Sequence, residues 1–124
     1  MLFAAICLGA SLHAQVVYTW NSGDILTGSI TPTGTTTVNP ADTLNIVSAL
    51  DHDFNALAVT NNGTVNWQDG NLRSGSSGSI TNTGIWNDNT TVNRQVNNAF
   101  GGGAATFTNY GTYNKTAATS DTQF

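Results

Sequence analysis

Few side chains of this chain could act as an acid, a base or a nucleophile. The sequence contains no Glu, and its two histidines are His13, near the N-terminus, and His52. A Ser-His-Asp set would have to use His52, which is flanked by Asp51 and Asp53, and no serine stands in the Gly-x-Ser-x-Gly context of a nucleophile elbow. We therefore predict that the protein is not an enzyme and that His52 is a solvated loop residue.

The aspartates are the next residues to consider, as metal ligands or as a catalytic pair. Asp51 and Asp53 are two residues apart, so they can share one face of a strand, where their oxygens would suit calcium. The Gly-Gly-x-Gly-x-Asp repeat of calcium-binding β-rolls is absent, as are the Asn-Thr-Asp, Asp-Asp and Gly-His-Gly motifs of pectin-cleaving β-helix hydrolases. We predict no metal site and no cofactor. Turn formation beside Gly, Asn or Thr explains three other aspartates, Asp69, Asp88 and Asp121.

The three tryptophans suggest carbohydrate binding, because a flat aromatic face can stack on a sugar ring. Trp86 aligns with Val65 and Tyr113 in the repeat described below, so we predict that it belongs to the core. Trp20 and Trp67 stay as candidate sugar contacts. The corresponding partners would be a surface polysaccharide or host-cell glycans.

An internal repeat is the most informative feature of the sequence. Three segments, 59–66, 80–87 and 107–114, align without gaps on the pattern apolar-Thr-Asn-x-Gly-x-apolar-Asn. The glycines of successive copies are 21 and 27 residues apart. Periods of about 20 to 50 residues are typical of solenoids and other stacked repeats. The repeat therefore predicts similar units that stack on one another.

The spacing within each copy of the repeat predicts which side chains stack on those of the neighbouring copies. Strand side chains alternate between two faces, so both apolar residues, the Asn and the Gly of a copy can face the same side. If copies stack at about 4.8 Å, the amides can hydrogen-bond to the neighbours above and below. We expect the glycine to permit a bend or a positive φ. The predicted structural ladder comprises Asn61, Asn82, Asn109, Gly63, Gly84 and Gly111.

Composition favours short strands over helices. Asn, Thr, Ser and Gly dominate, whereas charged residues make up only 8% of the chain. Thr favours strands, and Asn and Gly favour turns, so we predict an all-β fold in which a short helix fits only segments 47–57 and 92–99. The alternative to stacked coils is an antiparallel β-sandwich in which each Asn-x-Gly is a hairpin turn.

The charge of the chain excludes two classes of partner. The formal net charge is −4. Nucleic acids and anionic membrane surfaces both attract basic segments, which this sequence lacks. We therefore predict no nucleic-acid partner and no membrane insertion of the mature chain.

The N-terminus has the features of a signal peptide, residues 1–14. An apolar run from Leu2 to Leu12 is followed by the small residue Ala14, although no Lys or Arg precedes the run. The run is shorter than the roughly 20 residues that cross a bilayer. Cleavage after Ala14 would leave 15–124 as a single repeat domain without cysteine. We predict an exported protein, secreted or held at the outer cell surface.

The C-terminus predicts an unfinished repeat. Phe124 follows Phe107 by 17 residues, which is a feasible coil length. We therefore expect Phe124 to begin another copy and the domain to be truncated at its C-terminus. Exposed terminal coils of this kind would also allow end-to-end stacking between molecules.

Residues Asn61 to Asn66 read Asn-x-Gly-Thr-Val-Asn, and in this the chain resembles the repeat regions of bacterial haemagglutinin-like and autotransporter-like surface proteins. The resemblance implies a right-handed parallel β-helix, which this length would wind into roughly five coils. It also implies a non-catalytic role as a stalk or adhesin-like passenger. The alternatives are a carbohydrate-binding β-module and a fragment of a carbohydrate-active β-helix enzyme.

Overall fold

The computed structural model describes residues 14–20, 23–24 and 35–124, and every regular element in these ranges is a β-strand. Residues 1–13 of the predicted signal peptide lie outside the described residues. The strands form three sheets. The first sheet contains β1 (Val17–Trp20), β4 (Thr43–Ile46), β7 (Thr64–Trp67), β10 (Ile85–Asp88) and β13 (Thr112–Lys115). The second contains β2 (Gly23–Asp24), β5 (His52–Asp53), β8 (Leu72–Arg73), β11 (Arg94–Asn97) and β14 (Thr122–Gln123), and the third β3 (Thr35–Val38), β6 (Ala58–Asn61), β9 (Ser79–Asn82) and β12 (Thr106–Asn109).

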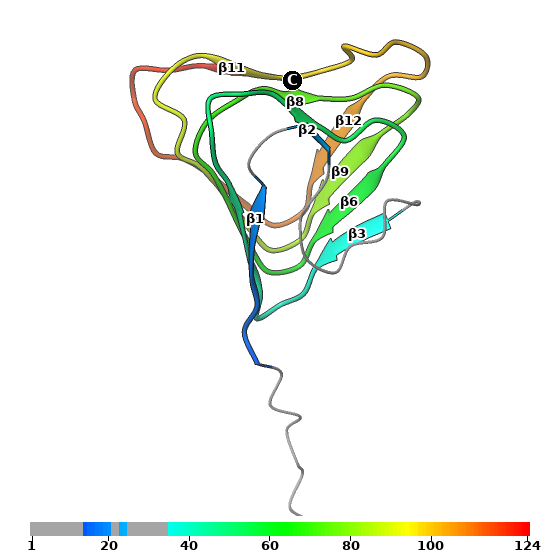
Figure 1. Ribbon diagram of the computed structural model, residues 1–124. Coiled ribbons are helices and arrows are strands. Elements are labelled where there is room, and N and C mark those ends of the chain that lie inside the picture. Colours follow the sequence, from blue (N-terminus) through cyan, green and yellow to red (C-terminus); the bar gives the residue numbers. More distant parts are fainter. Residues whose placement is uncertain (1–13, 21–22, 25–34) are drawn as a thin grey trace, which may run out of the picture.

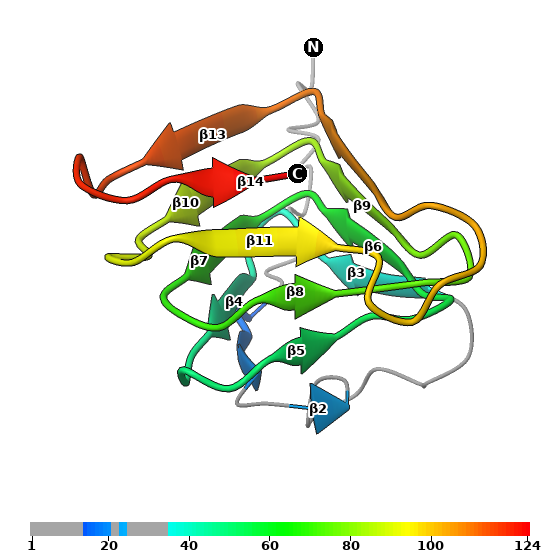
Figure 2. The same cartoon turned by 90° about the horizontal axis from the view of Figure 1, so that it is seen from above.

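The three sheets form the sides of a triangle when viewed along the stack (Figure 1), and successive coils lie one above another in the perpendicular view (Figure 2). Every pair of neighbouring strands is parallel. The fold is therefore a parallel β-helix, as predicted, and the antiparallel sandwich is excluded. The described strands make about four turns instead of the roughly five expected.

Neighbouring coils pair in the register that the repeat predicts. In the third sheet Val59 lies opposite Ile80, and Ile80 lies opposite Phe107. Burial alternates along β6, β7 and β9, so every second side chain enters the core. The second apolar column, in the first sheet, consists of Val65, Trp86 and Tyr113.

Each Asn-x-Gly forms a corner between the third and first sheets and not a hairpin turn. The glycines are required by close approach between coils. A Cβ on Gly84 would lie 2.2 Å from the carbonyl oxygen of Gly63, and a Cβ on Gly111 would lie 2.2 Å from that of Gly84. Each glycine lies at a bend, as expected, but none of the three has a positive φ.

The core is one apolar cluster enclosed by the three sheets. Its largest fully buried side chains are Trp67, Trp86 and Phe54. Aromatic rings pack edge to face along the stack, with 6.5 Å between the centroids of Trp67 and Trp86 and 5.1 Å between those of Trp86 and Phe107. This geometry is favourable for aromatic pairs and links β7 and β10 of the first sheet to β12 of the third.

Both segments that suggested a helix contain strands of the second sheet instead. Segment 47–57 includes β5, and segment 92–99 includes β11. The register places His52 opposite Leu72 and Leu72 opposite Val96, so each strand contributes one side chain to a buried column. Pairing with the neighbouring coils determines these strands more than local propensity does.

Phe124 does not occupy the position that we predicted for it. It follows β14, which pairs with β11 in the second sheet, and so it does not continue the third-sheet column of Phe107. The Phe124 ring nevertheless packs against the Phe107 ring of that column and against Tyr113 of the first sheet. The centroid of Phe124 lies 4.8 Å from that of Phe107 and 5.9 Å from that of Tyr113.

Candidate functional site

The three motif asparagines form a hydrogen-bonded column, which we call the inner ladder. Asn61 Nδ2 donates to Asn82 Oδ1 at 2.7 Å, and Asn82 Nδ2 donates to Asn109 Oδ1 at 2.6 Å. Asn61 and Asn82 are fully buried, whereas Asn109 is exposed. Buried amides need partners, so each coil supplies what the amide of the neighbouring coil requires.

The inner ladder also satisfies backbone groups at the corners. The Gly63 N–H donates to Asn61 Oδ1 at 3.1 Å, and Asn61 Nδ2 donates to the carbonyl oxygen of Ile85 at 3.0 Å. Asn82 Nδ2 donates to the carbonyl oxygen of Thr112 at 3.0 Å. Backbone groups at a corner lie where regular strand pairing is interrupted, so these amides replace the partners that a sheet would provide.

A second column, the outer ladder, was missed from the sequence. Its amides donate in the opposite direction along the stack, from Asn114 to Asn87 at 3.0 Å, from Asn87 to Asn66 at 2.9 Å, and from Asn66 to Asn45 at 2.9 Å. All four lie on the outward face of the first sheet. The eighth position of the repeat, which is Asn in all three copies, is the signal that could have revealed it.

Asp88 is a buried strand residue and not the turn residue that we predicted. It lies at the end of β10, opposite Trp67, and is fully buried. The Tyr113 hydroxyl donates to Asp88 Oδ2 at 2.6 Å, and the Thr122 hydroxyl donates to the same oxygen. Lys115 Nζ donates to Asp88 Oδ1 at 2.9 Å. The result is a polar cluster within the last described coils.

Thr90 completes this cluster. Its N–H and hydroxyl donate to Asp88 Oδ1 at 3.0 and 2.7 Å, and its carbonyl oxygen accepts from Lys115 Nζ at 3.0 Å and from the Ser120 hydroxyl at 2.6 Å. Burial alone would raise the pKa of Asp88, but hydrogen bonds from four side chains outweigh it and lower the pKa. The carboxylate is ionised and saturated with donors, which suits a structural role better than proton transfer.

His52 is buried, contrary to the prediction of a solvated loop residue. Its side chain is 0% exposed, and its ring contacts Trp20 edge-on with 5.2 Å between centroids. Neither ring nitrogen has hydrogen-bonding geometry to a partner in the described part of the chain. Burial lowers the pKa of His52, and the nearby carbonyl oxygens of Ser48 and Asp69 oppose this shift only in part. His52 is therefore a neutral core residue.

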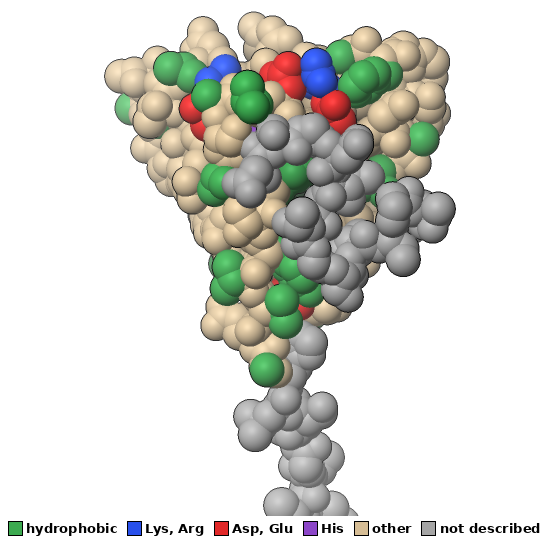
Figure 3. Space-filling view, viewed as in Figure 1, with side chains coloured by type: hydrophobic (Ala, Val, Ile, Leu, Met, Phe, Trp, Pro, Cys, Tyr) green, Lys and Arg blue, Asp and Glu red, His purple; other side chains and the backbone are tan. Residues whose placement is uncertain are grey.

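Asp51 and Asp53 face Arg73 of the next coil. Arg73 Nη1 lies 3.2 Å from Asp51 Oδ2, and Arg73 Nε donates to Asp53 Oδ1 at 2.7 Å. Charged side chains gather on this side of the molecule, along the second sheet (Figure 3). The guanidinium occupies the position between the carboxylates that a calcium ion would need. Across the described residues no three His, Cys, Asp or Glu side chains converge to hold one metal ion.

Neither Trp20 nor Trp67 can stack on a sugar, so this prediction is wrong. Their side chains are 3% and 0% exposed, and both belong to the apolar core. Trp67 Nε1 donates to the carbonyl oxygens of Asp69 and Gly70 at 3.1 and 2.9 Å. Burial of a large ring with its N–H satisfied is the ordinary state of a core tryptophan.

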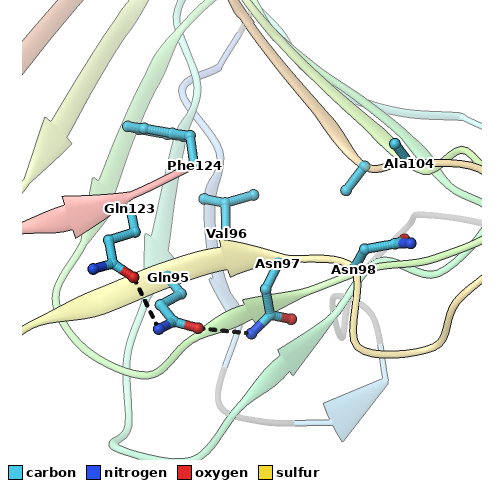
Figure 4. Close-up of a pocket in the computed structure, with 8 residues that line it drawn as sticks. Gln95, Val96, Asn97, Asn98, Ala104, Gln123 and Phe124 are labelled. Carbon is cyan, nitrogen blue, oxygen red and sulfur yellow. Dashed lines mark hydrogen bonds between the residues drawn. The ribbon is translucent and has the colours of Figure 1, made fainter.

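The structure offers a different surface for a polar ligand. An open pocket of about 320 Å³ lies between β11, β14 and residues 98–105 (Figure 4). Figure 4 shows Val96 and Phe124 on one face of β11 and β14, and the amides of Gln95, Asn97 and Gln123 on the opposite face. Gln95 Nε2 donates to Gln123 Oε1 at 3.1 Å, and Asn97 Nδ2 donates to Gln95 Oε1 at 3.4 Å. The apolar lining residues Val96, Ala104, Ala105 and Phe124 could contact an apolar sugar face.

The described ranges contain no helix that is long and apolar enough to cross a bilayer. The arrangement that recurs through most of the stack is the pair of asparagine ladders, and it is the candidate functional feature of the chain. Comparison with known proteins adds no relative, because no protein family, no curated protein and no solved structure matches this chain.

Proposed function

We propose that this chain is a non-catalytic structural segment of a secreted or cell-surface β-solenoid, a stalk or adhesin-like passenger of the bacterial haemagglutinin-like or autotransporter-like kind. The observation that carries the proposal is the pair of ladders. Side-chain amides bridge successive coils on the inner and on the outer side of the wall. These bonds run along the stack, which is the direction in which a stalk must hold its length.

The repetition of the coil supports the same proposal. Coils that contribute the same residue types at the same positions contact mainly their neighbours, so their number sets the length of the solenoid without changing its packing. A spacer needs this property, whereas a binding module depends on one particular coil. The proposed function therefore predicts that one coil can be removed without unfolding the remaining coils.

Deletion of residues 62–82 tests this prediction. The deletion joins Asn61 to Thr83 and restores the repeat pattern, removing the 21 residues that separate Gly63 from Gly84. We expect a folded protein shorter by one coil, about 4.8 Å along the stack, measurable by small-angle scattering and circular dichroism. The control is deletion of residues 62–71, which breaks the register and should unfold the protein. If both deletions unfold it equally, the coils are not interchangeable and the spacer proposal fails.

Export has its own test, because it depends on the N-terminal sequence and not on the solenoid. The apolar run before Ala14 supports cleavage at that point. Expressed in a secreting host, the mature protein should begin at or near Gln15 by intact-mass measurement. An exported, soluble product that retains residues 1–14 would contradict the signal peptide.

Glycan binding is a second candidate function, favoured by the uncharged pocket beside Phe124. A neutral polysaccharide from a cell surface or a host glycan fits its chemistry, since the lining side chains carry no charge. Titration of soluble neutral oligosaccharides should perturb the NMR signals of the Phe124 ring and of the Asn98 side-chain amide. Phe124→Ala should abolish the shifts of the Asn98 amide, whereas Gln68→Ala, at an exposed site outside the pocket, should not. Equal shifts in both variants would exclude this pocket as the site.

A further inference from the structure

Asn62 precedes Gly63 at the corner between β6 and β7, and this is the one Asn-Gly dipeptide of the sequence. At the equivalent corners the glycine follows Thr83 and Tyr110. Glycine lacks a side chain that would hinder its amide nitrogen, so Asn-Gly is the dipeptide most open to attack on the asparagine side chain. We propose that Asn62 is a self-modification site, a deamidation site that the folded corner blocks and that opening of the corner activates.

The reaction needs only water. The Gly63 nitrogen loses its proton to hydroxide and attacks Asn62 Cγ, so that an N–Cγ bond forms. The Cγ–Nδ2 bond breaks, and Nδ2 takes a proton from water and leaves as ammonia, which regenerates the hydroxide. Water then opens the resulting succinimide at one of its two carbonyls. The product is aspartate or isoaspartate at position 62, and the net change is one amide and one water converted to one carboxylic acid and one ammonia.

The nucleophile of this reaction is held by the inner ladder. The Gly63 N–H donates to Asn61 Oδ1 at 3.1 Å, and Asn61 is fully buried. Hydroxide must remove the proton that this hydrogen bond uses, and it must do so inside the wall. The corner therefore has to open before the nitrogen can react.

Two further contacts restrict the movement that ring closure requires. The backbone of Gly63 is confined by the coil below, because an added Cβ would lie 2.2 Å from the carbonyl oxygen of Asn39 and 2.4 Å from that of Asp42. The Asn62 side chain is fixed from the coil above, since the Thr83 hydroxyl donates to Asn62 Oδ1 at 2.6 Å. Attack requires rotation about the bonds of Asn62, and both neighbouring coils oppose it.

The modification would make an opened corner permanent. Isoaspartate inserts one additional carbon into the main chain between β6 and β7. The corner has no room for it, because the carbonyl oxygen of Gly63 lies 2.2 Å from the position of a Cβ on Gly84. Asn61 and Asn82 would no longer be in register for their hydrogen bond. Modification of Asn62 is therefore a lasting covalent consequence of an earlier opening of the stack.

Peptide mapping with isoaspartate quantification tests the proposal over days at mildly alkaline pH. Four samples are compared: wild type in buffer, wild type in denaturant, and the variants Asn61→Val and Leu72→Ala in buffer. Asn61→Val copies Val38, which lies opposite Asn61 in the coil below, and removes the acceptor for Gly63. Leu72→Ala destabilises the second sheet through a buried site outside the corner. Asn62→Thr introduces the residue that stands at the equivalent corner, Thr83. It is the negative control, because no deamidation product can form at this position.

We expect native wild type to react at least about tenfold more slowly than denatured wild type, since opening of a buried hydrogen-bonded corner precedes attack. Asn61→Val should raise the native rate about tenfold, and more than Leu72→Ala at matched stability. Equal rates in native and denatured wild type would overturn the proposal, as would Asn61→Val reacting no faster than Leu72→Ala. If Asn61→Val does not fold, Thr83→Val replaces it, and an unchanged native rate in that variant overturns the proposal.

Discussion

Val38 lies directly opposite Asn61 in the register of β3 and β6, at the position that is asparagine in the coils that follow. The inner ladder therefore begins on an apolar side chain that offers no partner to an amide. Of its three members, Asn82 has an asparagine on both sides. It is the position at which loss of the amide should have the largest effect.

Replacing Asn82 by leucine should destabilise the fold by about 1 to 3 kcal/mol, because both neighbouring amides lose a partner. Chemical denaturation of Asn82→Leu against wild type measures this difference. Asn55→Leu is the control, since Asn55 is exposed and the change should stay within about 0.5 kcal/mol. Equal midpoints for Asn82→Leu and wild type would show that the ladder contributes nothing to stability.

Substitution of a corner glycine by a larger residue should destabilise the fold for a steric reason. An alanine at Gly84 places its Cβ 2.2 Å from the carbonyl oxygen of Gly63, so two coils must separate. We expect Gly84→Ala to destabilise by about 3 kcal/mol, at the upper end for overpacking. At Gly101, which has a φ of +70° and no atom near the added Cβ, alanine should destabilise by only about 1 kcal/mol. Thermal melting of the two variants decides, and the reverse order would contradict close approach as the reason.

The parts of the fold that followed from the sequence are those that repeat. Val59, Ile80 and Phe107 could be aligned because each precedes the same Thr-Asn-x-Gly, and strand alternation then placed their side chains inward. The inner ladder followed from the same alignment. The outer ladder was equally visible at the last position of the motif, but an asparagine facing solvent needs no partner and gave no reason to expect one.

The residues that were placed wrongly from the sequence lie outside the repeat motif. His52 and Asp88 belong to types that are usually solvated, so both were assigned to loops. Their burial depends on register outside the motif, since His52 lies opposite Leu72 and Asp88 opposite Trp67. Partners from other coils, such as Lys115 for Asp88, reduce the free-energy cost of burying the polar group. No local sequence pattern predicts these partners.

The Asp88 cluster should respond to the loss of its cation. Lys115→Met leaves a buried carboxylate without its counter-charge, and we expect a loss of about 3 kcal/mol in the free energy of unfolding. Adding Asp88→Leu to this variant continues the apolar column of Ile46 and Trp67, and should recover most of the loss. Urea denaturation of wild type and of the single and double variants measures the coupling. A double variant that is no more stable than Lys115→Met would show that the cluster is not a paired charge.

The dependence of stability on pH should be set near neutrality by His52. Burial lowers the pKa of His52 in the folded protein, so the unfolded chain binds a proton first as the pH falls. Stability is therefore complete above the unfolded pKa of about 6.5 and decreases below it, toward the lower folded pKa, by up to about 1.4 kcal/mol per pH unit.

His52→Leu should remove this dependence. Leucine continues the column of Leu72 and Val96 and leaves no unpaired ring nitrogen in the core, so the variant should be at least as stable as wild type at pH 7. The gap should widen as the pH falls below about 6.5, because only wild type loses stability there. Asp88, whose pKa is lowered, weakens the fold only below its unfolded value of about 3.8, and so lies outside this window. Urea midpoints at pH 7, 6 and 5 provide the measurement, and parallel curves for the two proteins would show that folding does not lower the pKa of His52.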